Sequence, residues 1–391
     1  MSNIEYNFDS IIDRKNTNCL KYDALNQFFG EDNLQPFWVA DTDFETPNFI
    51  IDKIKERLEH PALGYTFKPD NFFQTITDWQ KRQHQWEIEN SWISTTPGVV
   101  SGIASSILAF TEKQDKIIIN TPVYYPFYAT IEGLERTILR NPLKLQDNRY
   151  QIDIEHFEQL AQEGAKMFVL CNPHNPGGTV WSKKELQAIG DICVRHNIII
   201  VSDEIHSDLI LGERKHTPIA SISKKISDKT ITLMAPSKTF NIAGLATSFV
   251  ICSNRKIRTT LDRTIYAVHI HGGNLLGNIA CEAAYEYGEE WVGKLIDYLA
   301  SNCELAIQFL KQELPELKIM KPDATYLLWI DFNAYGDEKE MEKRLKEIAK
   351  VALNKGSSFG EEGKGYFRFN FGCPREVMIE GLNKIVSAFK N

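Results

Sequence analysis

Three short, strongly apolar runs, each followed at once by polar side chains, constrain the fold of this chain more than any other feature. They span residues 166–171, 198–202 and 230–234. Runs this apolar are typical of strands that helices cover on both faces, as in parallel sheets. Open α/β sheets bind their ligands beyond the carboxyl ends of such strands. The polar side chains that follow the runs are therefore expected to meet at one edge of a sheet.

The polar residues delivered in this way are suited to chemistry. The first run leads to Asn175, the second to Asp203 and His206, and the third to Ser237 and Lys238. Most lysines are solvated surface charges, and lysine is almost never buried without a partner. Position alone would leave Lys238 without a role, so its functional interpretation depends on these neighbours.

Strand and helix signals alternate from about residue 95 to residue 250. Residues 117–120 form a strand-like run, and residues 137–163 add a strand and a helix. Ser182 and Glu185 have the spacing of a helix-starting capping box. This alternation predicts a mostly parallel sheet covered by helices on both faces.

The flanking regions give weaker signals. The amphipathic pattern over 48–58 predicts a helix, and residues 36–47 have the character of a strand. From 280 to 314 apolar residues recur at helical intervals, which predicts one long helix leading into a smaller C-terminal domain. That domain shows strand signals at its start, a charged helix over 337–354, and a strand over 366–372.

Composition limits the class of protein. At 391 residues the chain is long enough for two domains, and its net charge of −8 and pI near 5.7 argue against a nucleic-acid partner. The seven cysteines lack CxxC spacing and are expected to be reduced, and no run approaches membrane-spanning length. We therefore expect a cytoplasmic protein. His269 and His271 would lie on one face of a strand and could form a metal pair, but without suitably spaced further ligands we expect no metal site.

In order and spacing, Asn175, Asp203, His206 and Lys238 resemble the pyridoxal-phosphate (PLP) enzymes of fold type I, the class I/II aminotransferase superfamily. The resemblance extends over nearly the whole chain. It implies an α/β protein: an aminotransferase-like large domain with a mostly parallel sheet, plus a smaller α+β domain formed by the C-terminus and the N-terminal segment. The expected boundaries are 1–47, 48–285 and 286–391.

The resemblance assigns roles around the cofactor, pyridoxal 5'-phosphate. Lys238 would bond to the aldehyde carbon and later act as the general base at the substrate Cα, since burial lowers the pKa of an amine. Asp203 would keep the pyridine nitrogen protonated, with His206 and Asn175 orienting Asp203 and the ring oxygen. Tyr124 would stack on the ring, although the aromatic residues near it could simply pack a turn.

The cofactor phosphate is expected at the start of a helix. Gly98 lies at its mouth, where Val99 and Val100 would offer amides, and Ser237 would add a hydroxyl. Many helices begin with glycine, so this signal is weak by itself. The resemblance also makes Tyr65 a catalytic-site residue that reaches the neighbouring subunit's phosphate, which implies a homodimer; otherwise Tyr65 is an ordinary turn tyrosine.

Two residues are expected on the substrate side. Arg368 lies among aromatic residues in a strand and would bind the substrate α-carboxylate in a two-pronged pair; the alternative is a structural ion pair with a local glutamate. The resemblance implies that residues 36–47 line the substrate side of the site; Trp38 would take part in this lining, with core packing as an equal alternative.

Within the superfamily the likeness is greatest to the cystathionine β-lyase, or C-S lyase, branch. Residues 8–23 carry the branch's opening pattern, with Cys19 and Tyr22 in place of its usual Ser and Trp. Ala246 stands where many aminotransferases have an arginine, and His206 replaces a tyrosine. The resemblance implies β-elimination from L-cystathionine or cysteine S-conjugates, giving a thiol (homocysteine), pyruvate and ammonia. The alternatives are an aminotransferase acting on an amino acid and a 2-keto acid, and an additional regulatory protein-binding role.

Overall fold

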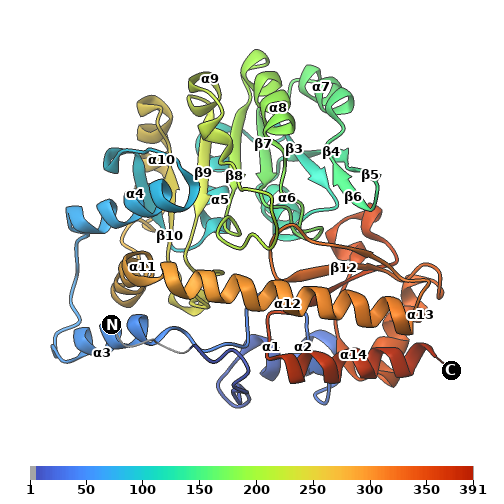
Figure 1. Ribbon diagram of the computed structural model, residues 1–391. Coiled ribbons are helices and arrows are strands. Elements are labelled where there is room, and N and C mark those ends of the chain that lie inside the picture. The colour runs from blue at the N-terminus through green and yellow to red at the C-terminus, as the bar shows by residue number, and fades with distance from the viewer. Residues whose placement is uncertain (1–5, 391) are drawn as a thin grey trace.

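The computed structural model describes residues 6–390, which form a large and a smaller sheet with helices packed around both (Figure 1). The large sheet has the strand order β2-β10-β9-β8-β7-β3-β4. Its strands are β2 (Ile93–Thr96), β3 (Lys116–Thr121), β4 (Thr137–Pro142), β7 (Met167–Cys171), β8 (Ile199–Asp203), β9 (Thr230–Met234) and β10 (Ser248–Ile251).

The three apolar runs are neighbours in this sheet. They form β7, β8 and β9, which pair in parallel, with Cys171 opposite Asp203 and Asp203 opposite Leu233. β3 and β4 continue the parallel arrangement, whereas β10 runs antiparallel to both β9 and β2. The prediction of a mostly parallel sheet is confirmed, and the carboxyl ends of the three runs lie at one edge.

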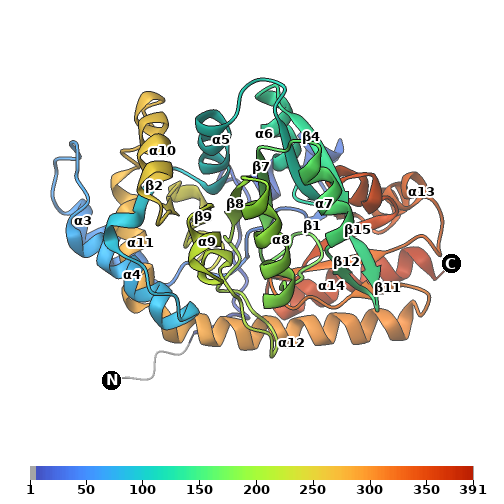
Figure 2. The ribbon, with the colours of Figure 1, turned by 90° about the horizontal axis from the view of Figure 1, so that it is seen from above.

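Helices cover both faces of the large sheet (Figure 2). α5 (Val99–Phe110) and α10 (Arg255–Ala267) pack on one face, against side chains such as Ile117 and Val201. α7 (Ile154–Gln162) and α8 (Lys183–Arg195) pack on the other face, against Ile118 and Ile200. Successive strand residues point to opposite faces, so a strand covered on both sides is apolar throughout.

The smaller sheet is antiparallel and belongs to the C-terminal part of the chain. Its order is β11-β12-β15-β14, formed by β11 (Lys318–Met320), β12 (Leu327–Asp331), β14 (Asn354–Lys355) and β15 (Tyr366–Asn370). The N-terminal segment joins this part, because β1 (Gln35–Pro36) pairs in parallel with β13 (Val351–Ala352). The expected α+β unit built from both chain ends is confirmed, while its boundaries at residues 47 and 285 stay a prediction.

The remaining elements connect or cover these sheets. Two long helices, α12 and α14, run side by side below both sheets in Figure 1. The bounds are α1 (Leu20–Asp23), α2 (Leu25–Phe29), α3 (Asn48–Leu58), α4 (Asp70–His84), α6 (Pro126–Gly133), α9 (Lys224–Ser227), α11 (Leu275–Tyr287), α12 (Glu289–Glu313), α13 (Glu338–Lys343), α14 (Arg375–Phe389), β5 (Lys144–Gln146) and β6 (Arg149–Gln151). Within residues 6–390, no helix combines the length and the apolar content that crossing a membrane requires.

The long helix predicted over 280–314 is wrong in one respect, because the chain forms two helices, α11 and α12, that meet at Gly288. A Cβ atom at this glycine would lie 2.2 Å from the carbonyl oxygen of Ala284 and 2.3 Å from the Phe240 ring. Only glycine allows this close approach. Apolar residues recur at helical intervals on both sides of Gly288, so the sequence pattern could not indicate the break between the two helices.

Three further predicted elements are shorter than expected or absent. The helix predicted over 337–354 ends as α13 plus a π-helical turn over 344–348, and Lys350 adopts φ +54°, which stops the helix before β13. Residues 36–47 form a strand only at their start and continue as an irregular segment with bends at 39–41 and 43–44. His269 and His271 follow α10 in a turn rather than on a strand.

Candidate active site

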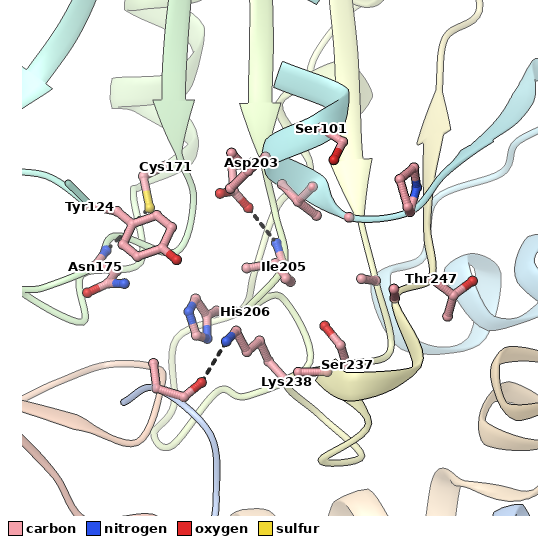
Figure 3. A pocket seen from close by; sticks show the side chains of 18 residues that line it. Ser101, Tyr124, Cys171, Asn175, Asp203, Ile205, His206, Ser237, Lys238 and Thr247 are labelled. Atoms are coloured by element: carbon pink, nitrogen blue, oxygen red, sulfur yellow. Dashed lines mark hydrogen bonds between the residues drawn. The ribbon is translucent and has the colours of Figure 1, made fainter. Parts of the chain in front are cut away.

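A cavity of about 180 Å³ lies beyond the carboxyl ends of β7, β8 and β9, beside the start of α5 (Figure 3). Most of the residues predicted for the site line it. They are Val99, Val100, Tyr124, Asn175, Asp203, His206, Ser237 and Lys238. Figure 3 shows Asp203 and Lys238 extending from separate elements, with His206 between them. The cavity is the place that parallel strand topology provides for a ligand.

Lys238 lies in the turn that follows β9. Its Nζ donates a hydrogen bond to the carbonyl oxygen of Ala40 at 2.6 Å. Burial lowers the pKa of Lys238, and the charge of Arg368 lowers it further, while Asp41 and Asp203 oppose these effects. A lowered pKa raises the fraction of free amine at neutral pH, and the free amine is the nucleophilic form.

Asp203 is the last residue of β8, and its side chain is buried. One carboxylate oxygen accepts a hydrogen bond from the N–H of Ile205 at 3.1 Å. Burial raises the pKa of Asp203 to about 7, although the hydrogen bond from Ile205 and the charge of Lys238 both lower it. A cationic ligand atom next to this carboxylate would favour its charged form, as an opposite charge does.

His206 is buried as a neutral imidazole. Burial, together with the charges of Lys238 and Arg368, lowers its pKa to about 3. Its Nδ1 has no hydrogen-bond partner among the described residues. Buried polar atoms are nearly always paired in native proteins, so an unpaired nitrogen at a cavity indicates a ligand atom.

The start of α5 forms the polar end of the cavity. No side chain caps this helix, whose N-cap residue is Gly98. A Cβ atom at Gly98 would meet nothing within 4 Å, so the space in front of the first amides is open. The hydroxyls of Ser101, Ser237 and Thr247 line the same region. Free amides and the positive end of the helix dipole make this a site for an anion such as a phosphate.

Tyr124 follows β3 and contributes a neutral phenol to the cavity wall, because burial raises its pKa to about 12. Its ring packs at a tilt against Tyr125, with 5.2 Å between the ring centroids. The stacking of Tyr124 on a cofactor ring stays a prediction.

Arg368 lies on β15 and reaches the cavity wall through Asn175. Its Nη1 donates to Asn175 Oδ1 at 3.0 Å, and its Nη2 donates to the carbonyl oxygen of Trp38 at 2.7 Å. Burial lowers the pKa of Arg368 to about 10. Among residues 6–390, no carboxylate forms an ion pair with it and its Nε is unpaired. Within this range Arg368 therefore has no glutamate partner of the kind that a structural ion pair requires. A buried cation is normally paired with an anion, so a bound anionic ligand is expected beside it.

Trp38 and Tyr65 lie outside the cavity lining. The Trp38 indole packs with Leu25 and Leu34, and its Nε1 donates to the carbonyl oxygen of Lys21. This geometry matches the core-packing alternative for the ring, while its backbone carbonyl contacts Arg368. Tyr65 lies on the loop between α3 and α4, and its side chain is fully exposed. A role for either side chain stays a prediction.

The resemblance places residues 36–47 on the substrate side of the site, but it does not reveal the contacts made by the backbone of residues 38–43, hereafter the 38–43 segment. Five successive carbonyl groups, 38 to 42, accept hydrogen bonds from side chains elsewhere in the chain. The donors are Arg368 to Trp38, Asn370 to Val39 and Asp41, Lys238 and Tyr326 to Ala40, and Asn241 and Arg14 to Thr42. Backbone acceptors carry no residue signature, so only the fold could identify them.

Metal binding finds no support in the part of the chain that the structure describes, which holds no cluster of three or more potential metal ligands. His269 and His271 lie 6.3 Å apart between ring centroids, and the His271 ring stacks on Tyr266. The His269 side chain is exposed.

Comparison with known proteins identifies the family of this chain. The family model described as aminotransferase class I and II matches residues 39–385. The chain belongs to this family. It is 41% identical to the protein named cystathionine beta-lyase PatB of Bacillus subtilis, over 98% of this chain and 99% of that one.

Two solved structures of the family are similar along their whole length. One is cystalysin from Treponema denticola, which contains a pyridoxal 5'-phosphate cofactor; its TM-score is 0.96 at 38% identity, covering 99% of both chains. The other is the PLP-bound C-S lyase from Staphylococcus hominis, with a TM-score of 0.93 at 33% identity, covering 100% of this chain and 99% of that one. The fold expected from the resemblance is confirmed by these neighbours.

Proposed function

We propose that the protein is a PLP-dependent carbon-sulfur β-lyase that cleaves L-cystathionine, or related cysteine S-conjugates, to a thiol, pyruvate and ammonia. The observation that carries the choice of lyase is the 41% identity, over nearly the full length of both chains, to a cystathionine beta-lyase. Ala246, which lines the cavity in place of a phosphate-binding arginine, supports the same branch.

The cavity fits PLP in three chemically distinct places. The uncapped start of α5 suits its phosphate, the buried carboxylate of Asp203 suits its ring nitrogen, and the amine of Lys238 suits its aldehyde. The unpaired Nδ1 of His206 lies at the same cavity. When bound, PLP supplies an electron sink for the pair of electrons left at the substrate Cα.

The chain's own groups account for substrate binding and proton transfer. Arg368 binds the α-carboxylate of the substrate, because its buried charge lacks a counter-ion among the described residues. The amine of Lys238 takes the proton from Cα as a general base. The Cβ–S bond then breaks, the sulfur leaves with the bonding electron pair and gains a proton, and water converts the three-carbon remainder to pyruvate and ammonia.

We further propose a homodimer in which Tyr65 serves the neighbouring subunit's site. The loop between α3 and α4 exposes Leu63, Tyr65 and Phe67: Leu63 and Phe67 are 62% and 84% exposed, and Tyr65 is fully exposed. A cluster of exposed large apolar side chains on a projecting loop is typical of a surface that a protein partner covers. The seven cysteines are free thiols, which supports a reducing compartment such as the cytoplasm.

The test is an assay of the purified protein with L-cystathionine in the absence of any 2-keto acid. We expect pyruvate and a free thiol in equal amounts, and no product from the Lys238→Ala variant. Amino transfer that depends on an added 2-keto acid, without pyruvate release, would instead identify an aminotransferase.

A further inference from the structure

The N-terminal pattern over 8–23 lies outside the cavity lining, yet the buried Lys21 and the half-buried Arg14 both reach the 38–43 segment. Arg14 donates from Nη1 to Asp43 and from Nη2 to Asp41, each at 2.6 Å, and Nη1 also donates to the carbonyl oxygen of Thr42 at 3.0 Å. Lys21 donates from Nζ to Asp43 at 2.6 Å and lies 3.7 Å from Asp41. Two cations and two carboxylates thus form a neutral cluster, hereafter the N-terminal clamp.

The clamp is held in place by the rest of the same motif. The carboxylate of Asp23 accepts hydrogen bonds from the N–H groups of Asn16, Thr17 and Cys19, which closes the turn between Arg14 and Lys21. The Arg14 guanidinium lies over the Tyr22 ring, 5.6 Å from its centroid. The motif therefore organises one contact surface, and that surface is directed at Asp41 and Asp43.

Burying charged side chains costs free energy, so their retention here indicates a functional role. Lys21 is wholly buried and the side chain of Asp43 is 5% exposed. Burial lowers the pKa of Lys21, but the charges of Asp43 and Asp41 outweigh it and raise the value overall. Buried ion pairs add little net stability compared with apolar packing, because both charges lose their hydration. The Lys21–Asp43 pair is buried in this way, whereas the side chains of Arg14 and Asp41 are 19% and 18% exposed. The buried pair indicates control of position.

The clamp positions the backbone of the 38–43 segment, which contacts Lys238 and Arg368. The 38–43 segment lies outside the helices and strands, and side-chain contacts fix its shape together with a backbone hydrogen bond from the N–H of Asp43 to the carbonyl oxygen of Gly372 at 2.8 Å. Asn370 and Asn241 donate to its carbonyl groups, and the clamp holds the side chains of Asp41 and Asp43. In the same segment, the carbonyl of Ala40 accepts from Lys238 and that of Trp38 accepts from Arg368.

We propose that Arg14 and Lys21 are positioning residues for the lyase reaction. Through Asp41 and Asp43 they fix the 38–43 segment, so that the Ala40 carbonyl aims the Lys238 amine and the Trp38 carbonyl holds the Arg368 guanidinium. The kinetic part of this inference rests on the proposed function. A misplacement of about 1 Å at reacting groups lowers a rate by roughly 100-fold, which sets the size of the effect.

The test compares the wild-type holoenzyme with Lys21→Met and Arg14→Gln. Hydrogen-exchange mass spectrometry follows the peptide that covers residues 36–47. We expect its exchange to rise by about tenfold in both variants, with no change over α8, and kcat/KM per bound cofactor to fall by roughly 100-fold. Lys53→Met is the matched control, because Lys53 pairs with Glu56 at 2.9 Å on the exposed face of α3. It is expected to match the wild type in both measurements.

A merely structural role predicts a different pattern. Wild-type kcat/KM per bound cofactor in both variants, with a lower melting temperature and faster exchange throughout the chain, would overturn the proposal. Arg14→Lys keeps the charge but loses the two-pronged contact, so its kcat/KM should fall between those of the wild type and Arg14→Gln. If Lys21→Met does not fold, the two Arg14 variants decide. If the wild type releases no pyruvate, the proposed function fails, while the exchange measurement still decides the positioning.

Discussion

Asp203 illustrates how a single buried group sets the behaviour of the site. In the unfolded chain its carboxyl has a pKa near 3.8, and burial raises that value to about 7 in the folded protein. Between these two pH values the unfolded chain has released the proton and the folded chain retains it. The stability of the cofactor-free protein therefore falls as pH rises from about 4 to 7 through this group.

We expect Asp203→Asn to remove that contribution. An asparagine cannot ionise, so the cofactor-free variant should gain stability relative to the wild type as pH rises across this window, by at most about 4 kcal/mol. Urea unfolding of both proteins at a series of pH values measures the difference. Parallel stability curves for the two proteins would show that Asp203 is not buried as an acid with a raised pKa.

At this scale the sequence predicted which side chains meet at the cavity better than it predicted which backbone groups contact them. Asn175, Asp203, His206 and Lys238 could be placed together because each follows a strand of the same parallel sheet. The carbonyls of the 38–43 segment could not, because every residue has one and only tertiary contacts select those that matter. The resemblance singled out Trp38, whose ring is packed away while its carbonyl contacts Arg368.

At the scale of helices and strands, α5, which forms the proposed phosphate site, packs against β9, which leads to Lys238. Gly102 of α5 lies so near β9 that a Cβ atom there would approach Leu233 Cδ2 to 2.6 Å. Gly102→Val should therefore displace the start of α5. We expect a loss of about 1–3 kcal/mol in stability and a cofactor affinity weakened by roughly tenfold or more.

Equilibrium unfolding and titration with PLP measure these two effects. Gly133→Ala is a suitable control, since a Cβ atom at the end of α6 would meet nothing within 4 Å. It should leave both quantities near the wild-type values. An unchanged cofactor affinity in Gly102→Val would show that the placement of α5 does not limit phosphate binding.

Short sequence motifs predicted the ends of some helices correctly but could not predict the ends of others. The capping box of Ser182 and Glu185 is present in full, because its two hydrogen bonds depend only on residues three apart. The break at Gly288 depends instead on the Phe240 ring, which is distant in sequence. Boundaries set by such contacts require the packed structure.

For the whole molecule, the proposed sharing of Tyr65 between subunits makes a specific prediction. A Tyr65→Ala subunit lacks the residue that it lends to its neighbour, and a Lys238→Ala subunit lacks its own amine. In a hybrid of the two, one site carries both lesions and the other carries neither. Mixing and refolding the two variants should therefore restore up to half of the wild-type activity per hybrid dimer.

Size-exclusion chromatography with light scattering confirms that the mixture contains dimers. Mixed Tyr65→Ala and Lys238→Ala subunits that show only the sum of their separate activities, although hybrids have formed, would contradict a shared site. Tyr65 would then be a surface residue of the loop between α3 and α4.

The proposed reaction requires that Lys238 carry the cofactor. Borohydride reduction of the PLP-loaded protein, followed by digestion and mass spectrometry of the lysine-containing peptides, tests this attachment. We expect one reduced pyridoxyl phosphate group per chain, on the peptide that contains Lys238. Attachment at another lysine, or no attachment at all, would contradict the proposed reaction.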